Sequence, residues 1–175
     1  SLLKVAAFCC LNLLEGEKVP AADVKETILN EIVFGGSTER IDALASKDSA
    51  FAEMTKSARA DLAALRKLRD DDASGALKEF FGDGEDPREW KGKDRWGETT
   101  KAVVTVADGR VTKLDLGGCT KLAALPDAIG ELKALTELYL NECSKLVALP
   151  ESIGGLDALW KLSLDACPNL VFPPG

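Results

Sequence analysis

Apolar residues recur every 24 positions in the last third of the chain. The columns of this repeat hold Leu114, Leu138 and Leu162; Leu116, Leu140 and Leu164; Cys119, Cys143 and Cys167; Leu122, Leu146 and Leu170; and Pro126, Pro150 and Pro174. A constant period in the twenties, with leucines at set offsets, indicates stacked supersecondary units that cannot bury their apolar faces alone. In each copy the first leucines alternate with polar residues, which predicts a short strand with one buried face.

The second half of each copy predicts a short helix. Pro126 and Pro150 suit the first turn of a helix, where no backbone N–H is needed. Asp127 and Glu151 follow them directly, and acidic side chains are favourable at a helix N-terminus. The apolar residues of 129–135 return at helical spacing, so we expect this segment to face the same core as the strand.

Together the columns spell L-x-x-L-x-L-x-x-C-x-x-L, which resembles the cysteine-containing form of the leucine-rich repeat family. The repeats look closest to those of intracellular plant immune receptors and related cytosolic proteins. The resemblance implies an α/β fold: a leucine-rich repeat solenoid, with a parallel strand ladder and short convex helices, preceded by an α-helical region. Residues 111–175 would hold two complete repeats and a truncated third. Because the chain begins at Ser1 without Met and stops partway through a repeat, we expect it to be a fragment of a longer protein.

Aromatic residues and a tight turn precede the repeats. Leu77, Phe80 and Phe81 predict a short helix, and Trp90 and Trp96 would cover the open end of the leucine core. Residues 73–110 resemble the N-terminal cap of plant-type leucine-rich repeat proteins, although the usual cysteine pair of that cap is missing.

The turn at Asp108–Gly109 joins two apolar stretches of this region. Asp-Gly is a favoured pair for a tight hairpin turn. We therefore expect Val103–Val106 to pair with Val111–Leu116 as a hairpin or as adjacent strands.

Residues 1–72 predict a helical region that resembles no family. Helical patterns cover Leu2–Leu14, Pro20–Ile32, a segment around Ile41 and Leu44, and Ser49–Arg69. The last of these has an apolar stripe, which could pack within the region or on a partner helix. The stripe consists of Phe51, Met54, Ala58, Leu62, Leu65 and Leu68, and it lies opposite Lys56, Arg59, Asp61, Arg66 and Lys67. For Leu2–Leu14 we prefer a buried helix with inert Cys9 and Cys10, and a truncated signal peptide is the alternative.

Composition excludes several function classes. The chain lacks histidine, which removes His-based triads and imidazole ligands. Its net charge is −7 without a basic cluster, so we expect no nucleic-acid partner. No apolar stretch reaches the roughly 20 residues that span a bilayer, so we expect no membrane span in this sequence. The acidic run Asp70–Asp72 lacks the ligand spacing of a calcium loop and is interpreted as a solvated charge run.

The positions and number of the cysteines indicate a structural role and a cellular compartment. Cys119, Cys143 and Cys167 occupy one repeat position beside a leucine core and lack a fourth ligand, so we expect them to be reduced, buried and non-catalytic. An odd count of five without disulfide-like spacing favours a reducing compartment, and we expect a cytoplasmic protein. We expect no metal and no cofactor.

The predicted function is protein–protein interaction rather than catalysis. The resemblance implies that a protein or peptide binds the concave face formed by the variable strand positions, in a receptor, scaffold or immune-type sensor. Those positions are Thr112, Lys113, Asp115, Thr136, Glu137, Tyr139, Trp160, Lys161 and Ser163. We also expect self-association through the uncapped last repeat. The alternative is the recognition domain of an enzyme, a kinase, ligase or nucleotide-switch ATPase, whose catalytic part lies outside this sequence.

Overall fold

The computed structural model describes residues 38–47, 49–82, 84, 87, 90–93 and 99–171. The helices expected over Leu2–Leu14 and Pro20–Ile32, the two cysteines at positions 9 and 10, and Trp96 lie outside the described residues. The chain divides into two compact units, residues 1–62 with 106–110 and residues 63–105 with 111–175. The repeats belong to the second unit.

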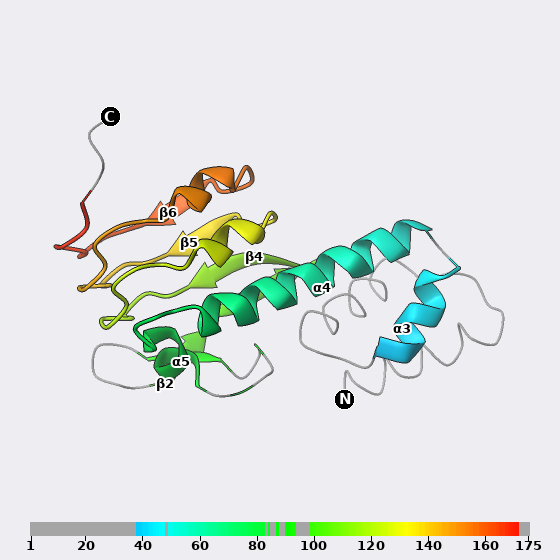
Figure 1. The fold of residues 1–175 in the computed structure, drawn as a ribbon, viewed down its shortest axis with the longest axis horizontal. Helices are drawn as coiled ribbons and strands as arrows, with labels where there is room; N and C mark the ends of the chain where they lie inside the picture. Colours follow the sequence, from blue (N-terminus) through cyan, green and yellow to red (C-terminus); the bar gives the residue numbers. More distant parts are fainter. Residues whose placement is uncertain are drawn as a thin grey trace. The chain divides into compact units, whose positions relative to one another are not determined.

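Helices come first along the described chain, and strands follow (Figure 1). The helices are α3 (Thr38–Ala45), α4 (Ser49–Asp70) and α5 (Ala76–Phe81). The strands are β1 (Lys91–Lys93), β2 (Thr99–Ala102), β3 (Val104–Ala107), β4 (Arg110–Asp115), β5 (Glu137–Tyr139) and β6 (Lys161–Ser163). Two 3₁₀ segments, η2 (Asp127–Glu131) and η3 (Glu151–Gly155), lie between the last strands.

Helix α4 confirms the prediction of a long helix, but its buried stripe differs at three positions, 54, 55 and 61. Met54 is exposed, and Thr55 is buried instead, with its hydroxyl donating to the Phe51 carbonyl (2.8 Å). Asp61 was expected on the polar face and is fully buried. Its carboxylate accepts two hydrogen bonds from the Arg110 guanidinium, at 2.9 and 3.0 Å. The ion partner lies 49 positions away, so spacing within the helix could not reveal it.

The connection from α4 to α5 corrects the prediction of a solvated charge run at one of its three residues, because Asp70 and Asp71 are exposed but Asp72 is not. Asp72 is buried, and its Oδ2 accepts the Leu77 N–H at 2.8 Å while its Oδ1 accepts the Ser74 N–H and hydroxyl. Gly75 follows in the left-handed region, with φ of 67°. The Asp72 carboxylate thereby satisfies N–H groups at the start of α5, which otherwise have no partner within the helix.

An aromatic cluster supports the region before the sheet. Trp90 is fully buried and stacks on Phe81, with 4.7 Å between ring centroids and 4° between ring planes. Its indole N–H donates to the Gly84 carbonyl (2.8 Å), and the Arg69 guanidinium lies 5.5 Å from the Trp90 ring centroid. The short helix predicted from the apolar residues at positions 77, 80 and 81 is confirmed, and all three side chains are buried.

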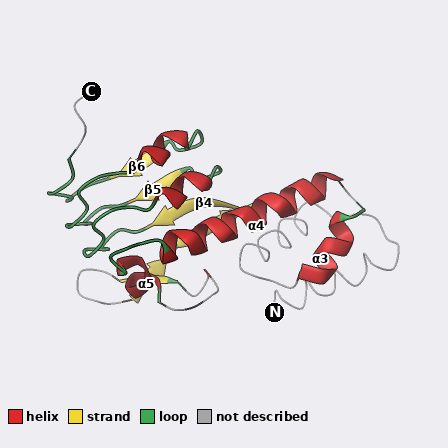
Figure 2. Ribbon diagram, viewed as in Figure 1, coloured by secondary structure: helices red, strands yellow, loops and turns green. Residues whose placement is uncertain are grey.

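The main sheet has the strand order β3-β4-β5-β6, of which Figure 2 labels β4, β5 and β6. Strand β3 runs antiparallel to β4 through the turn at Asp108–Gly109, which confirms the predicted pairing of these strands. Strands β4, β5 and β6 are parallel, and their register places Leu114, Leu138 and Leu162 side by side. The 24-residue period is thus the register of the parallel strands.

This architecture contradicts the predicted leucine-rich repeat solenoid. The described residues form a small mixed sheet of four strands with few helices, rather than a continuous parallel ladder. The segments expected to be convex helices are five-residue 3₁₀ turns, which begin after the extended backbone of Pro126 and Pro150. Strands β5 and β6 have three residues each and the 3₁₀ turns have five, so the expected unit of a strand and an α-helix is not formed in these copies.

Burial decreases from the first copy to the last. Seven side chains of the repeated leucine and cysteine columns in the first two copies are inaccessible to solvent: Leu114, Leu116, Leu122, Leu138, Leu140, Cys143 and Leu146. In the last copy Leu162 is 39% exposed, and Leu164 and Cys167 are half-buried. The predicted burial of these strands therefore holds for β4 and β5 and is wrong for β6, which forms the edge of the sheet.

The backbone is left-handed at one repeated position after each strand. Gly118, Glu142 and Ala166 have φ of 85°, 60° and 57°, and they lie 24 residues apart. The Gly118 N–H donates to the Asn141 carbonyl (2.8 Å), and the Glu142 N–H donates to the Asp165 carbonyl (2.7 Å). The turns at Gly118 and Glu142 are thus each bonded to the same turn of the next copy.

Candidate functional site

The predicted binding residues occupy aligned rows of the parallel strands. Lys113, Glu137 and Lys161 form one row. The next row on the same face holds Asp115, Tyr139 and Ser163, because side chains alternate along a strand. The leucine row lies between them and faces the core. The register therefore brings polar side chains that are up to 50 residues apart in the sequence onto one surface. We call this surface the polar face.

Tyr139 is the centre of this face. The Lys113 ammonium lies 4.6 Å from its ring centroid, and the Lys161 ammonium lies 5.0 Å from it. The Tyr139 hydroxyl donates to Glu137 Oε2 at 2.5 Å. These residues, Lys113, Glu137, Tyr139 and Lys161, form the tyrosine cluster. Cation–π contacts at exposed sites contribute about 0.5–1 kcal/mol each, so the ring is held in one orientation before any partner arrives.

The electrostatics of the tyrosine cluster keep Lys161 charged. A side-chain hydrogen bond with Tyr139 raises the pKa of Lys161 above its ordinary value, and the nearby charge of Glu137 raises it further. Lys161 is therefore protonated throughout the neutral range. The cluster presents both signs of charge around an aromatic ring.

The threonines of the predicted site serve mainly to join strands. Both the N–H and the hydroxyl of Thr136 donate to the Thr112 carbonyl, at 2.8 Å each. The Thr112 hydroxyl reaches the Thr105 carbonyl at 3.4 Å. Trp160 continues this row, and its N–H donates to the Thr136 carbonyl (3.1 Å). Its indole ring is 71% exposed, so the backbone of Trp160 is held while its side chain stays accessible.

Two other predicted residues have local roles in turns. Asp115 is 7% exposed, and its Oδ1 accepts the Gly117 N–H at 3.0 Å, which stabilises the turn after β4. Ser163 donates its hydroxyl to Asp165 Oδ2 at 3.1 Å. Of the predicted set, the residues whose side chains are positioned to meet a partner are thus those of the tyrosine cluster and Trp160.

The repeated cysteines bond to the backbone of the preceding chain segment. Cys143 Sγ donates to the Leu116 carbonyl at 3.4 Å, and Cys167 Sγ donates to the Leu140 carbonyl at 3.0 Å. Burial raises the pKa of the Cys119 and Cys143 thiols to about 12. Among the described residues, no group of three or more Cys, Asp or Glu side chains is placed to hold a metal ion.

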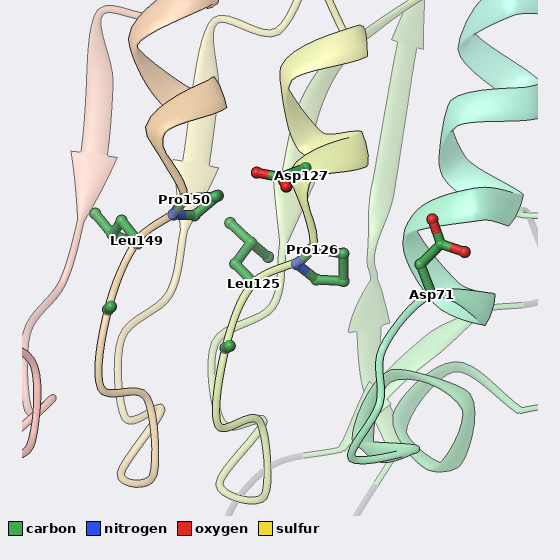
Figure 3. A pocket seen from close by; sticks show the side chains of 8 residues that line it. Asp71, Leu125, Pro126, Asp127, Leu149 and Pro150 are labelled. Carbon is green, nitrogen blue, oxygen red and sulfur yellow. The ribbon is translucent and has the colours of Figure 1, made fainter.

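A groove that the sequence did not predict lies beyond the strands, where the chain enters the 3₁₀ segments (Figure 3). It has a volume of about 430 Å³ and is lined by Ala124–Asp127, Ala148–Pro150 and Asp71. We call it the Leu-Pro groove. The repeated Leu-Pro pairs at 125–126 and 149–150 were a visible signal. The contribution of Asp71, which follows α4, could not be seen from the sequence.

None of the described helices is long and apolar enough to cross a membrane.

Comparison with known proteins adds no further information. No model of a protein family, no curated protein and no solved structure matches the chain. A function must therefore be argued from the geometry of the polar face and of the Leu-Pro groove.

Proposed function

We propose that the second unit binds a protein or peptide partner on the polar face, with the tyrosine cluster and Trp160 as the main contacts. The observations that carry the proposal are the held ring of Tyr139 and the exposure of Trp160, which directly precedes β6 and is 71% exposed. Tyrosine and tryptophan are enriched among the residues that dominate binding energy at protein interfaces. A tryptophan that a partner covers buries a large apolar area, and its N–H can bond to a polar group of that partner.

Preorganisation of the ring supports this proposal. Each side chain that must be ordered on binding costs about 0.5–1.5 kcal/mol. Tyr139 is already held by Lys113, Lys161 and Glu137, so a partner that packs on it would avoid most of this cost. Trp160 has only two side-chain torsions, which keeps its own ordering cost low.

The charges of the polar face favour a partner of mixed charge. The polar face carries two lysines, Lys113 and Lys161, and two acidic residues, Asp115 and Glu137, so attractive and repulsive contacts with a uniformly charged polymer nearly cancel. A protein or peptide can place carboxylates near the lysines and a donor near Glu137. Rim charges of this kind mainly select the partner and its orientation, whereas the aromatic rings contribute most of the affinity.

The test compares partner capture by the intact chain and by a Tyr139→Ala/Trp160→Ala variant. Proteins retained by the immobilised chain from its source cell are identified by mass spectrometry, and one purified partner is then titrated calorimetrically. Loss of both rings should weaken binding by about thirtyfold or more, which corresponds to roughly 2 kcal/mol.

A Val147→Ala variant is the matched control, because it also removes an exposed apolar side chain of the same unit and leaves the polar face intact. Circular dichroism should show that both variants keep the secondary structure. Equal affinity of the double variant and the control for the same partner would show that the polar face is not the binding surface.

A further inference from the structure

The geometry points to a second binding site in the Leu-Pro groove, for a peptide segment that carries arginine or lysine next to proline or leucine. The groove and the polar face are built from different parts of each copy. The polar face uses the strands, and the groove uses the segment between each strand and the following 3₁₀ turn. The inference therefore goes beyond the proposed function and does not depend on it.

The floor of the groove offers apolar contact. Ala124 and Ala148 form a parallel bridge, which joins the two copies beneath the groove, and both have small, exposed side chains. Pro126 and Pro150 have no N–H, and each proline carbonyl accepts the N–H three residues further along the chain (3.1 Å in both cases). A ligand on this floor therefore gains contacts with the alanines, leucines and proline rings rather than hydrogen bonds to the prolines.

The rim of the groove carries negative charge. The carboxylates of Asp71 and Asp127 stand on the rim, with the Pro126 ring between Leu125 and Asp71 (Figure 3). The neighbouring cation is Lys67, whose ammonium is bonded to Glu131 at 2.6 Å. Three carboxylates thus surround one ammonium that already has a strong partner. The remaining negative potential complements a guanidinium or ammonium group of a ligand.

The shape of the groove favours a short peptide segment. Ligand sites commonly have volumes of about 300–1,000 Å³, and this groove lies in the lower part of that range. It is open rather than enclosed, so a chain can cross it and leave at both ends. A proline in that chain lowers the entropy cost of binding because its extended backbone is largely ordered beforehand.

The walls of the groove are held in place before binding. The ion pair between Lys67 and Glu131 ties the end of α4 to η2, and Gly130 allows η2 to approach η3 closely. A Cβ atom at Gly130 would lie 2.7 Å from the Ser152 carbonyl oxygen, so only glycine fits there without a shift. The two Leu-Pro segments therefore keep a constant separation.

The experiment is a titration of the ¹⁵N-labelled chain with the peptide Gly-Arg-Pro-Leu-Arg-Gly, blocked at both ends, followed by amide shifts in NMR spectra. We expect shifts at Ala124, Leu125, Asp127, Ala148 and Leu149. A matched peptide with glutamate in place of both arginines should cause none of them. The shifts should also shrink as salt rises, because salt screens exposed charges.

Two variants test the charged rim. Asp71→Asn/Asp127→Asn should weaken binding of the arginine peptide about three- to tenfold, as expected for two exposed charge pairs. Glu53→Gln/Asp157→Asn removes the same net charge at exposed positions outside the groove and should leave the affinity unchanged.

The outcomes separate the two sites. Shifts confined to Lys113, Tyr139 and Lys161 would overturn the groove assignment and leave the proposed function of the polar face standing. Absence of shifts, equal binding of the glutamate peptide, or equal weakening by both double variants would overturn it as well. Groove shifts that a Tyr139→Ala variant leaves unchanged would establish the groove as a separate site.

Discussion

At the scale of single residues, the repeated cysteines show how one column of the sequence serves the stacking of copies. Each thiol bonds to a backbone carbonyl of the preceding segment, over a separation of 27 residues for Cys143 and Cys167. A small side chain with a donor is needed there. Cysteine supplies both and tolerates burial beside leucines. This contact explains the repetition of cysteine without any catalytic or metal-binding role.

Thiol reactivity should follow burial. Burial raises the pKa of Cys119 and Cys143 to about 12, so at pH 8 only about one thiol in ten thousand is ionised. Cys167 is half-buried at the edge copy. We expect iodoacetamide to modify Cys167 before Cys119 and Cys143 in the native protein, as measured by peptide mass spectrometry. Labelling of Cys143 as fast as Cys167 at pH 8 would contradict the assignment.

The same shift predicts a loss of stability at high pH. A raised pKa in the folded state means that folding favours the neutral thiol. The contribution of Cys119 and Cys143 is therefore complete below the ordinary thiol pKa of 9 and is lost progressively as pH rises towards 12. A Cys143→Ala variant should show a smaller decrease of the urea midpoint between neutral and strongly alkaline pH than the original chain.

At the scale of elements, equivalent strands of successive copies differ because of their place in the sheet. β5 has a neighbour on each side, and β6 has none beyond it among the described residues. Leu140 is accordingly inaccessible to solvent, while its repeat partner Leu164 is half-buried. The contribution of each leucine to the free energy of unfolding therefore depends on its position in the sheet, since the residue type is the same.

Substitution of these two leucines measures that difference. Leu140→Ala should lower the free energy of unfolding by about 2–5 kcal/mol, because it leaves a cavity in the core. Leu164→Ala removes the same atoms from a partly solvated site and should cost less than half as much. Urea denaturation of both variants provides the comparison, and equal losses would mean that β6 is covered as well as β5.

The local pattern of apolar residues predicted the individual helices and strands better than it predicted the architecture. The spacing of apolar residues gave α4 and α5, and the constant period gave the register of β4, β5 and β6. The solenoid and its convex helices were wrong, because the period does not reveal that η2 and η3 are 3₁₀ turns or that β3 is antiparallel.

Long-range contacts likewise escaped the sequence pattern. The burial of Asp61 depends on Arg110, and the Leu-Pro groove depends on Asp71. The alternation of side chains along a strand was enough to place Tyr139 on the polar face. The lysines that contact its ring come from both neighbouring strands, and their position follows only from the register of the sheet.

At the scale of the whole molecule, the last copy presents apolar surface beside an open strand edge. Leu162 is 39% exposed and Val171 is 70% exposed. An edge strand with accessible leucine is a template for pairing with another chain. The self-association expected from the sequence therefore remains a prediction, now assigned to the edge of β6.

Sedimentation velocity should show concentration-dependent association of this chain. A Leu162→Glu variant, which places a charge on the edge strand, should remain monomeric, whereas Lys145→Glu at an exposed position outside the strands should associate like the original. A monomeric original chain at high micromolar concentration would contradict the prediction.

The left-handed turns after the strands have an evolutionary consequence. Gly118, Glu142 and Ala166 adopt the same conformation with three different residue types, although a residue other than glycine bears about 1–2 kcal/mol there. The neighbouring backbone bonds hold the turn shape, so this position can drift among the copies while the repeat persists. The shared origin of such repeats can therefore be recognised in their backbone geometry after their amino-acid sequences have diverged.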